Sequence, residues 1–330
     1  MSELKQILGN RHNIEHFKEA VRKGKVSHAY IIDGPEGIGK KTFAGYIAAA
    51  LLCEKGIEEG PCMVCGSCVK ADTHNHPDII WVEHDKPTVL SIDEIRQQVI
   101  DTVDIVPYYG PYKIYIIKDA QLLNDNGQNA LLKTLEEPPE YALFFLLTDN
   151  YDRLLDTIKS RCMKLRMEPL DQEIIIRELG KSGAEKALIA ENAALSKGNL
   201  GLAKSLTEDE EKAALKNEAL KALKNLSNLD ALEIFQFAAD LDKLDGAQVL
   251  SYMQMWYRDL ALVKNNAGDG RLYFEKEKAV LRRQAEQISQ DGLGRVFTAM
   301  TEAKRRLDNS VKCEAVFETL FLTIREEVKK

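Results

Sequence analysis

Hydrophobic residues in the first half of the chain gather in short continuous runs, separated by longer stretches with helical spacing. The runs lie at residues 28–32, 78–83, 113–117, 143–148 and 163–167. Continuous apolar runs, without alternation of apolar and polar residues, are typical of strands buried on both faces of a parallel sheet. Helices are expected between the runs, for example at residues 92–103, where Ser91 and Glu94 have the spacing of a capping box. The pattern predicts an α/β fold with helices on both faces of the sheet.

Beyond Pro169 the composition changes to helix formers, with few strand candidates. Apolar residues recur at three- and four-residue spacing, as in Leu250, Met253, Tyr257 and Leu260, which predicts helices with one apolar face. The acidic stretch 208–211 is either a domain boundary or the solvated start of a helix. We predict three domains: an α/β domain over residues 1–168, a small helical domain over 169–207, and an all-helical C-terminal domain over 208–330.

Length and charge narrow the possible functions. The 330 residues are enough for two or three domains with cores of their own. The 45 basic and 52 acidic side chains give a net charge of −7, which argues against extended independent binding to nucleic acid. No apolar stretch approaches the ~18 residues that a membrane span needs, and the first residues are polar. We expect a cytoplasmic protein without a membrane segment.

Four cysteines crowd into sixteen positions within an insertion at residues 53–77: Cys53, Cys62, Cys65 and Cys68. Glycines and a proline between them allow tight turns, so that four thiolates can converge on Zn²⁺ in a closed, structural site. Two alternatives are reduced cysteines in a loop and a redox pair. His74 and His76 follow closely, but histidines in a polar loop are more often surface residues than ligands.

A glycine-rich loop joins the first apolar run to the helical pattern that follows it. This order is typical of a phosphate-binding loop, in which backbone N–H groups and a lysine bind phosphate and a hydroxyl binds Mg²⁺. The hydroxyl position is occupied by Lys41, so binding of ATP stays open, and a glycine turn without ligand is the alternative. The candidate nucleotide-binding residues are Gly34, Gly37, Gly39, Lys40 and Thr42.

Four features together resemble one family. They are the glycine loop, the cysteines after its helix, the sequence ALLKTLEEP at 130–138 and the triplet Ser160-Arg161-Cys162. The chain is similar to the bacterial clamp-loader subunits of DNA polymerase III, in the AAA+ superfamily. The resemblance implies a RecA-like parallel sheet with a zinc-binding insertion, a helical lid, and a helical C-terminal collar domain that joins a ring of related subunits.

The resemblance also implies which parts of an ATPase are missing. In an active member the third strand ends in an Asp-Glu pair, whereas this chain has Lys118 and Asp119. An active lid motif usually has arginine at the position of Gly201. Together with Lys41, these departures imply that the chain does not hydrolyse ATP. By the same resemblance, Arg161 is expected to act as an arginine finger in trans, on ATP held by a neighbouring subunit.

The implied function is that of a non-catalytic subunit of a DNA-directed DNA polymerase holoenzyme. Its expected partners are the gamma/tau ATPase and delta subunits, with the sliding clamp and primed DNA contacted through the assembled complex. One alternative is an active ATPase of the gamma/tau type. A second is a zinc-containing DNA-binding protein that acts alone, which the acidic balance opposes.

Overall fold

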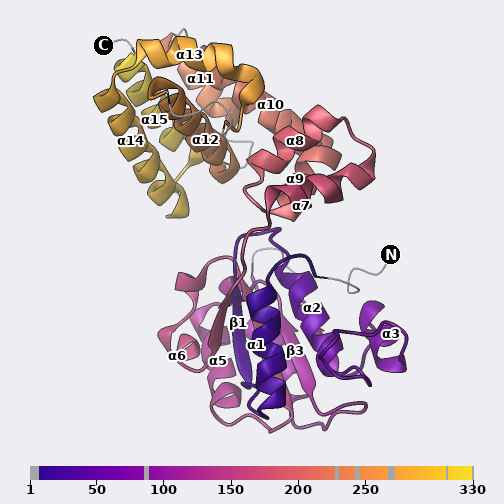
Figure 1. Cartoon of the computed structure of the whole chain (residues 1–330). Helices are drawn as coiled ribbons and strands as arrows, with labels where there is room; N and C mark the ends of the chain where they lie inside the picture. The colour runs from indigo at the N-terminus through magenta and orange to yellow at the C-terminus, as the bar shows by residue number, and fades with distance from the viewer. Residues whose placement is uncertain are drawn as a thin grey trace. The chain divides into compact units, whose positions relative to one another are not determined.

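The computed structural model describes residues 7–84, 89–226, 230–241, 246–266, 272–309 and 311–328. The chain divides into two compact units, shown in Figure 1. The first contains Met1–Ile174 and the segment Gly198–Leu202, and the second contains Ile175–Lys197 and Ala203–Lys330. The segment Gly198–Leu202, which the sequence suggested as part of a helical domain, therefore belongs to the unit that carries the sheet.

The first unit contains a five-stranded parallel sheet with strand order β2-β3-β4-β1-β5. The strands are β1 (Ala29–Asp33), β2 (Ile79–Val82), β3 (Lys113–Ile117), β4 (Ala142–Thr148) and β5 (Met163–Arg166). Every residue of β3 and β4 is buried, as expected for central strands covered on both faces. The edge strand β5 exposes Met163, Lys164 and Arg166. The predicted α/β fold with a parallel sheet is confirmed.

Helices surround this sheet. They are α1 (Arg11–Arg22), α2 (Lys40–Leu51), α3 (Gly66–Asp72), α4 (Ile92–Ile95), the π-helical η1 (Arg96–Ile100), the 3₁₀ turns η2 (Ala120–Leu122) and η3 (Tyr151–Arg153), α5 (Asp125–Glu136) and α6 (Asp156–Lys159). The capping box at Ser91 is present. The continuous helix expected at 92–103 is wrong in part, because the Asp101 N–H bonds the carbonyl of Arg96 in a π turn. The carbonyl of Thr102 then accepts a hydrogen bond from the buried Lys113 ammonium, and the helix does not continue.

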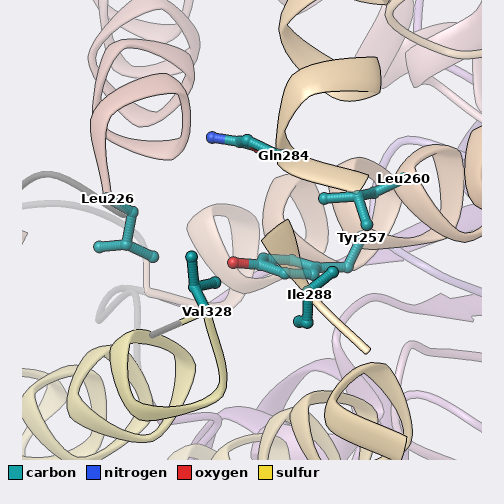
Figure 2. Close-up of a pocket in the computed structure, with 6 residues that line it drawn as sticks. All are labelled: Leu226, Tyr257, Leu260, Gln284, Ile288 and Val328. Atoms are coloured by element: carbon teal, nitrogen blue, oxygen red, sulfur yellow. The ribbon is translucent and has the colours of Figure 1, made fainter. Parts of the chain in front are cut away.

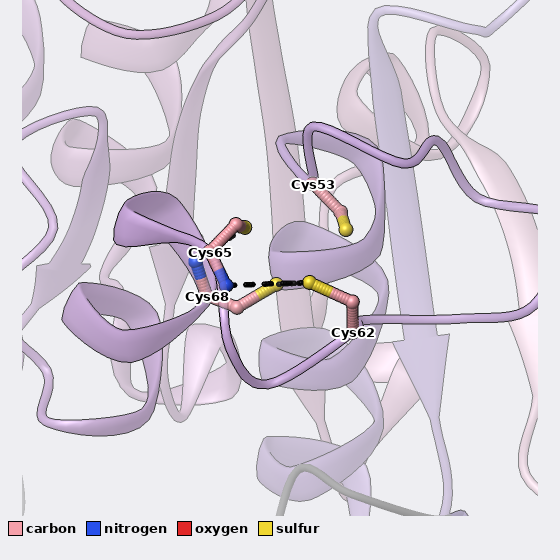
Figure 3. Close-up of side chains that lie close together, drawn as sticks. All are labelled: Cys53, Cys62, Cys65 and Cys68. Atoms are coloured by element: carbon pink, nitrogen blue, oxygen red, sulfur yellow. Dashed lines mark hydrogen bonds between the residues drawn. The ribbon is translucent and has the colours of Figure 1, made fainter.

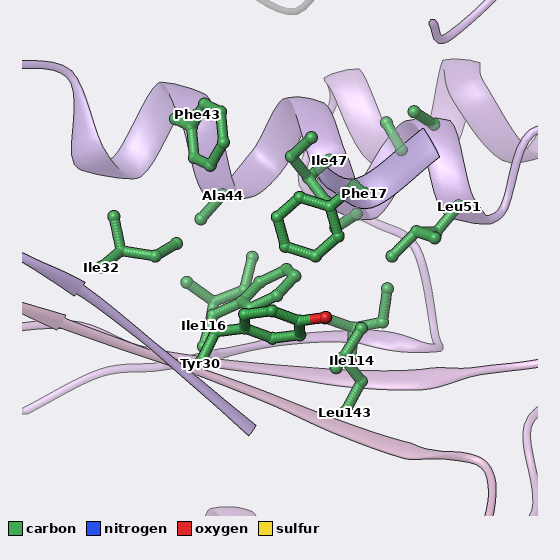
Figure 4. Packing of buried hydrophobic residues seen from close by; sticks show 14 of the residues in the cluster. Phe17, Tyr30, Ile32, Phe43, Ala44, Ile47, Leu51, Ile114, Ile116 and Leu143 are labelled. Carbon is green, nitrogen blue, oxygen red and sulfur yellow. The ribbon is translucent and has the colours of Figure 1, made fainter. Parts of the chain in front are cut away.

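Side chains of each strand enter two separate cores, one on each face of the sheet. On one face Tyr30 of β1 packs with Phe17 of α1 and Phe43 of α2, as Figure 4 shows. On the other face, Ile31 of the same strand joins the core that contains Leu131 of α5. Because successive side chains of β1 point to opposite faces of the sheet, this one five-residue strand contributes to both cores.

The remaining helices form the all-helical part of the chain. They are α7 (Gln172–Leu179), the 3₁₀ turn η4 (Gly180–Ser182), α8 (Lys186–Leu195), α9 (Leu200–Glu208), α10 (Glu210–Asn225), α11 (Ala231–Leu241), α12 (Gly246–Lys264), the 3₁₀ turn η6 (Glu275–Glu277), α13 (Lys278–Gln287), α14 (Gln290–Asp308) and α15 (Cys313–Val328). Lys216 of α10 is buried, and its ammonium lies 2.9 Å from both the carboxylate of Glu191 and the amide oxygen of Asn192 in α8. A buried cation needs such partners. The contact joins α8 to α10, and the domain boundary expected at residue 207 stays a prediction.

A small cavity lies among these helices, between Leu226, Tyr257, Gln284 and Val328. The Tyr257 hydroxyl points into it, as Figure 2 shows. About 10 Å³ is open to the centre of a water molecule, which is room for about one water. Ligand pockets are usually 300–1,000 Å³, so this cavity does not offer a site for a small molecule. Within the described ranges, no helix has the length and apolar character needed to cross a membrane.

Candidate functional site

The four cysteines of the insertion converge on one point, as Figure 3 shows. Cys53 follows α2, Cys62 precedes α3, Cys65 is the N-cap of α3, and Cys68 lies within that helix. Their sulfur atoms all lie within 4.8 Å of one another. Zn–S bonds of ~2.3 Å in a tetrahedron place sulfurs ~3.8 Å apart. The four thiols predicted from the sequence are therefore positioned to hold a metal ion.

Backbone amides favour the charged form of the Cys62 thiol. The amide of Cys65 lies 3.4 Å from the sulfur of Cys62, and the amide of Cys68 lies 3.4 Å from the sulfur of Cys65. The N–H groups of Val64 and Cys65 lower the pKa of the Cys62 thiol to about 6, because they stabilise the thiolate. Burial raises the pKa of Cys68, and a bound cation would reverse this effect by stabilising the charge.

A buried hydrogen-bonded chain connects α3 to an exposed loop. The Nδ1 atom of His76 accepts the Asp78 N–H at 3.0 Å, so its Nε2–H is the one that donates to the Ser67 hydroxyl, at 3.0 Å. The Asp78 carboxylate accepts the N–H groups of Tyr108 and Tyr109, each at 2.7 Å. His76 is neither a surface residue, as its surroundings in the sequence suggested, nor a ligand in the cysteine cluster. It supports α3, the helix that begins at the cysteine cluster.

The glycine-rich loop follows β1 and ends at the start of α2. Gly37 and Gly39 have φ values of +78° and +102°, which residues with a side chain rarely adopt. The Lys40 ammonium donates to the carbonyls of Gly34 and Pro35, at 2.6 and 3.1 Å. Burial lowers the pKa of Lys40, as expected for a partly desolvated cation. The lysine at the start of α2 thus closes the loop on itself.

Two further lysines, Lys41 and Lys118, lie beside the Trp81 ring. Lys118 follows β3, and its ammonium lies 2.5 Å from the carboxylate of Glu83, which follows β2. This ion pair lowers the pKa of Glu83. The ammonium groups of Lys41 and Lys118 lie 5.5 and 5.8 Å from the centre of the Trp81 ring, a range typical of cation–π contacts. Two cations at this position oppose binding of a divalent cation.

The segment Gly198–Leu202 packs against the glycine loop. The Gly201 N–H donates to the Gly37 carbonyl at 3.0 Å, and the Asn199 amide donates to the Glu36 carbonyl at 2.6 Å. A Cβ atom on Gly201 would lie 2.5 Å from the oxygen and 2.7 Å from the Cα of Gly37. The backbone of Gly201 therefore lies where no side chain fits.

Arg161 lies after α6, in the loop that leads to β5. Its Nη1 group donates to the Thr157 carbonyl at 2.8 Å and to the Ser160 hydroxyl at 3.3 Å. Its Nη2 atom forms an ion pair at 2.6 Å with Glu136, the last residue of α5, and the Arg161 side chain is 33% exposed. The guanidinium is thus held at the surface of the sheet unit.

Two family models match the chain. A model described as "DNA polymerase III, delta subunit" matches residues 9–171, and one described as "DNA polymerase III, delta subunit, C terminal" matches residues 210–326. The chain belongs to the DNA polymerase III delta subunit family. The resemblance read from the glycine loop, the cysteines and the two later motifs is confirmed.

Relatives of this family cover the chain to different extents. The DNA polymerase III subunit delta' of Bacillus subtilis is 29% identical over 93% of this chain and 93% of its own length. The subunit tau of Escherichia coli is 34% identical over 61% of this chain and 32% of its own length. The chain spans less than half of the first tau and gamma relatives it matches. A solved gamma subunit-related protein of Thermotoga maritima is 18% identical, covering 96% of this chain and 99% of its own, with a TM-score of 0.37.

Sequence reasoning missed three acidic residues whose partners lie far away in the sequence. Glu83 ends an apolar run, and its pairing with Lys118 requires the knowledge that β2 and β3 are neighbours. Glu136 is part of the family motif at 130–138, but its partner lies 25 positions further on. Asp78 starts a strand run and bonds a loop 30 residues away.

We expect replacement of Asp78 by alanine to release the loop that contains Tyr108 and Tyr109, because two N–H groups lose their acceptor. The loss of such bonds should speed hydrogen exchange at both amides by about tenfold or more. Exchange measured by NMR or mass spectrometry checks this. Asp104→Ala removes an exposed carboxylate of the same segment and serves as control. Equal protection of the loop in both variants would contradict the prediction.

Proposed function

We propose that this chain is a delta-prime-type subunit of the DNA polymerase III clamp loader, which helps to load the sliding clamp on primed DNA without hydrolysing ATP itself. The observation that carries the proposal is Lys118, which occupies the position of a Mg²⁺ ligand and is paired with Glu83. Phosphoryl transfer depends on stabilisation of charge by the metal ion. A lysine at this position removes that contribution.

The share of the chain that one relative matches supports the same assignment. The Bacillus subtilis delta' subunit matches over 93% of both chains. The three-part organisation, with a nucleotide-binding-type domain at 1–168, a lid at 169–207 and a collar at 208–330, remains part of this proposal. The proposal implies a cytoplasmic protein that assembles with gamma/tau and delta subunits and meets the clamp and DNA within that assembly.

An active ATPase of the gamma/tau type is the second candidate. The 34% identity to the Escherichia coli tau subunit favours it. It is opposed by three positions, Lys41, Lys118 and Gly201, where the hydroxyl, the acidic metal ligand and the lid arginine of an active member are missing. We therefore favour the subunit that does not hydrolyse ATP.

We expect the isolated chain to show no ATP turnover above background, because the metal-binding side chains are replaced by lysines. A coupled ATPase assay with Mg²⁺ checks this. The variant Lys40→Ala identifies contamination, since turnover by another protein would survive the substitution. Mg²⁺-dependent turnover that disappears in Lys40→Ala would favour the gamma/tau assignment and refute ours.

We further infer that the cysteine cluster holds structural Zn²⁺. Four thiolates leave no open position for a substrate or a water, and zinc favours such ligands. The amide donors around Cys62 and Cys65 support thiolate ligands at the start of α3. When bound, the ion would hold the ends of the insertion together.

Metal analysis should find about one zinc per chain. Cys65→Ser should lower the zinc content and speed exchange of amides at 53–72, while the amides of β4 keep their protection, because the insertion lies outside the sheet. Cys313→Ser, at a cysteine of the other unit, should leave zinc unchanged. If wild-type protein without zinc protects the amides of the insertion equally well from exchange, the zinc assignment is wrong.

Arg161 is proposed to act in trans on the γ-phosphate of ATP held by a neighbouring ATPase subunit. Its own loop lacks the residues that would use an arginine, whereas its guanidinium is partly exposed. The planar guanidinium can donate two parallel hydrogen bonds to the oxygens of a phosphate. An arginine supplied in this way stabilises the charge that develops during phosphoryl transfer.

Arg161→Ala should lower the ATPase and clamp-loading rates of the assembled complex by at least about tenfold, since an arginine finger contributes ~10³–10⁵. Arg161→Lys should restore little, because lysine lacks the planar fork. Arg153→Ala, which removes an exposed arginine nearby, is the control. If the Arg161→Ala complex assembles and turns over ATP at the wild-type rate, the role in trans is wrong.

A further inference from the structure

Three groups of this chain hold the guanidinium of Arg161. Two are local, the Thr157 carbonyl and the Ser160 hydroxyl. The third is the carboxylate of Glu136, which comes from another helix, α5, and lies 2.6 Å from Nη2. A carboxylate supplied from a separate element fixes the direction of the side chain in a way that neighbours in sequence do not.

The contacts leave donors for a further ligand. A guanidinium carries five N–H donors. Nη1 uses its two hydrogens on Thr157 and Ser160, and Nη2 faces Glu136 with one side. Within the described part of the chain, Nε has no acceptor, and one hydrogen of Nη2 also remains. Arg161 can therefore stay in this orientation and still donate to oxygens of a phosphate.

The strength of the ion pair decides whether Glu136 orients Arg161 or withholds it. Both side chains are partly exposed, 33% for Arg161 and 47% for Glu136. Exposed pairs of this kind change an equilibrium by about fivefold at most. A contact this weak does not withhold a guanidinium from a triphosphate, but it does restrict a long side chain that otherwise samples many rotamers.

We propose that Glu136 is a positioning residue, which orients Arg161 toward the nucleotide of the neighbouring subunit. This inference rests on the proposed role of Arg161 in trans. Glu136 does not touch the nucleotide in this arrangement, and its effect passes through the arginine. Glu137, the next residue, has the same charge and is exposed, but it contacts no cation within the residues that the structure describes.

The test uses the assembled complex with primed DNA and clamp, and measures kcat and KM for ATP. Glu136→Ala should lower kcat about three- to fivefold, in line with the strength of an exposed ion pair, and should leave KM unchanged, because ATP binds to the neighbour. Glu136→Gln, which keeps an oxygen acceptor, should retain more than half of the activity. Glu137→Gln is the matched control and should behave as wild type.

A double variant separates positioning from a general structural effect. In a complex that carries Arg161→Ala, the further change Glu136→Ala should have no additional effect, because the residue it orients is gone. An additional loss in that background, an unchanged kcat in Glu136→Ala, or a raised kcat would each overturn the inference. If Arg161→Ala alone has no effect, the proposed role of Arg161 in trans fails together with the positioning role, whereas a loss in Arg161→Ala with none in Glu136→Ala refutes the positioning role only.

Discussion

The parallel direction of all five strands determines where the chemistry of this chain can lie. Parallel neighbours need helical crossovers, and their carboxyl ends share one edge of the sheet. The glycine loop leaves β1 at that edge, and Lys118 leaves β3 there. The cysteine insertion lies within the crossover between β1 and β2, so α3, with two of the four clustered cysteines, is attached to the sheet without interrupting a strand.

Two of the cations at this edge are held by groups of this chain. Lys40 is held by carbonyl groups, and Lys118 by the carboxylate of Glu83. Exposed ion pairs of this kind contribute little to folding stability, ~0–1 kcal/mol. The ammonium groups therefore act mainly on ion binding, because a site that they line repels a divalent cation.

Local patterns in the sequence were enough to predict the strands and the cysteine cluster. The apolar runs are continuous because the central strands are buried on both faces, and the four thiols lie within sixteen residues. Contacts between distant segments were not predictable. The pairing of Glu83 with Lys118 requires the strand order, and that of Glu136 with Arg161 requires the packing of α5 beside α6. The burial of His76 was missed for the same reason, since its polar neighbours in sequence do not reveal what covers it.

The contact between Gly201 and Gly37 bears on how this chain can evolve. The backbone of one glycine lies against the backbone of the other, so a residue with a side chain at position 201 would clash with Gly37. The contact therefore restricts which residues this position accepts, because any side chain at position 201 would require the main chain at residues 198–202 to move.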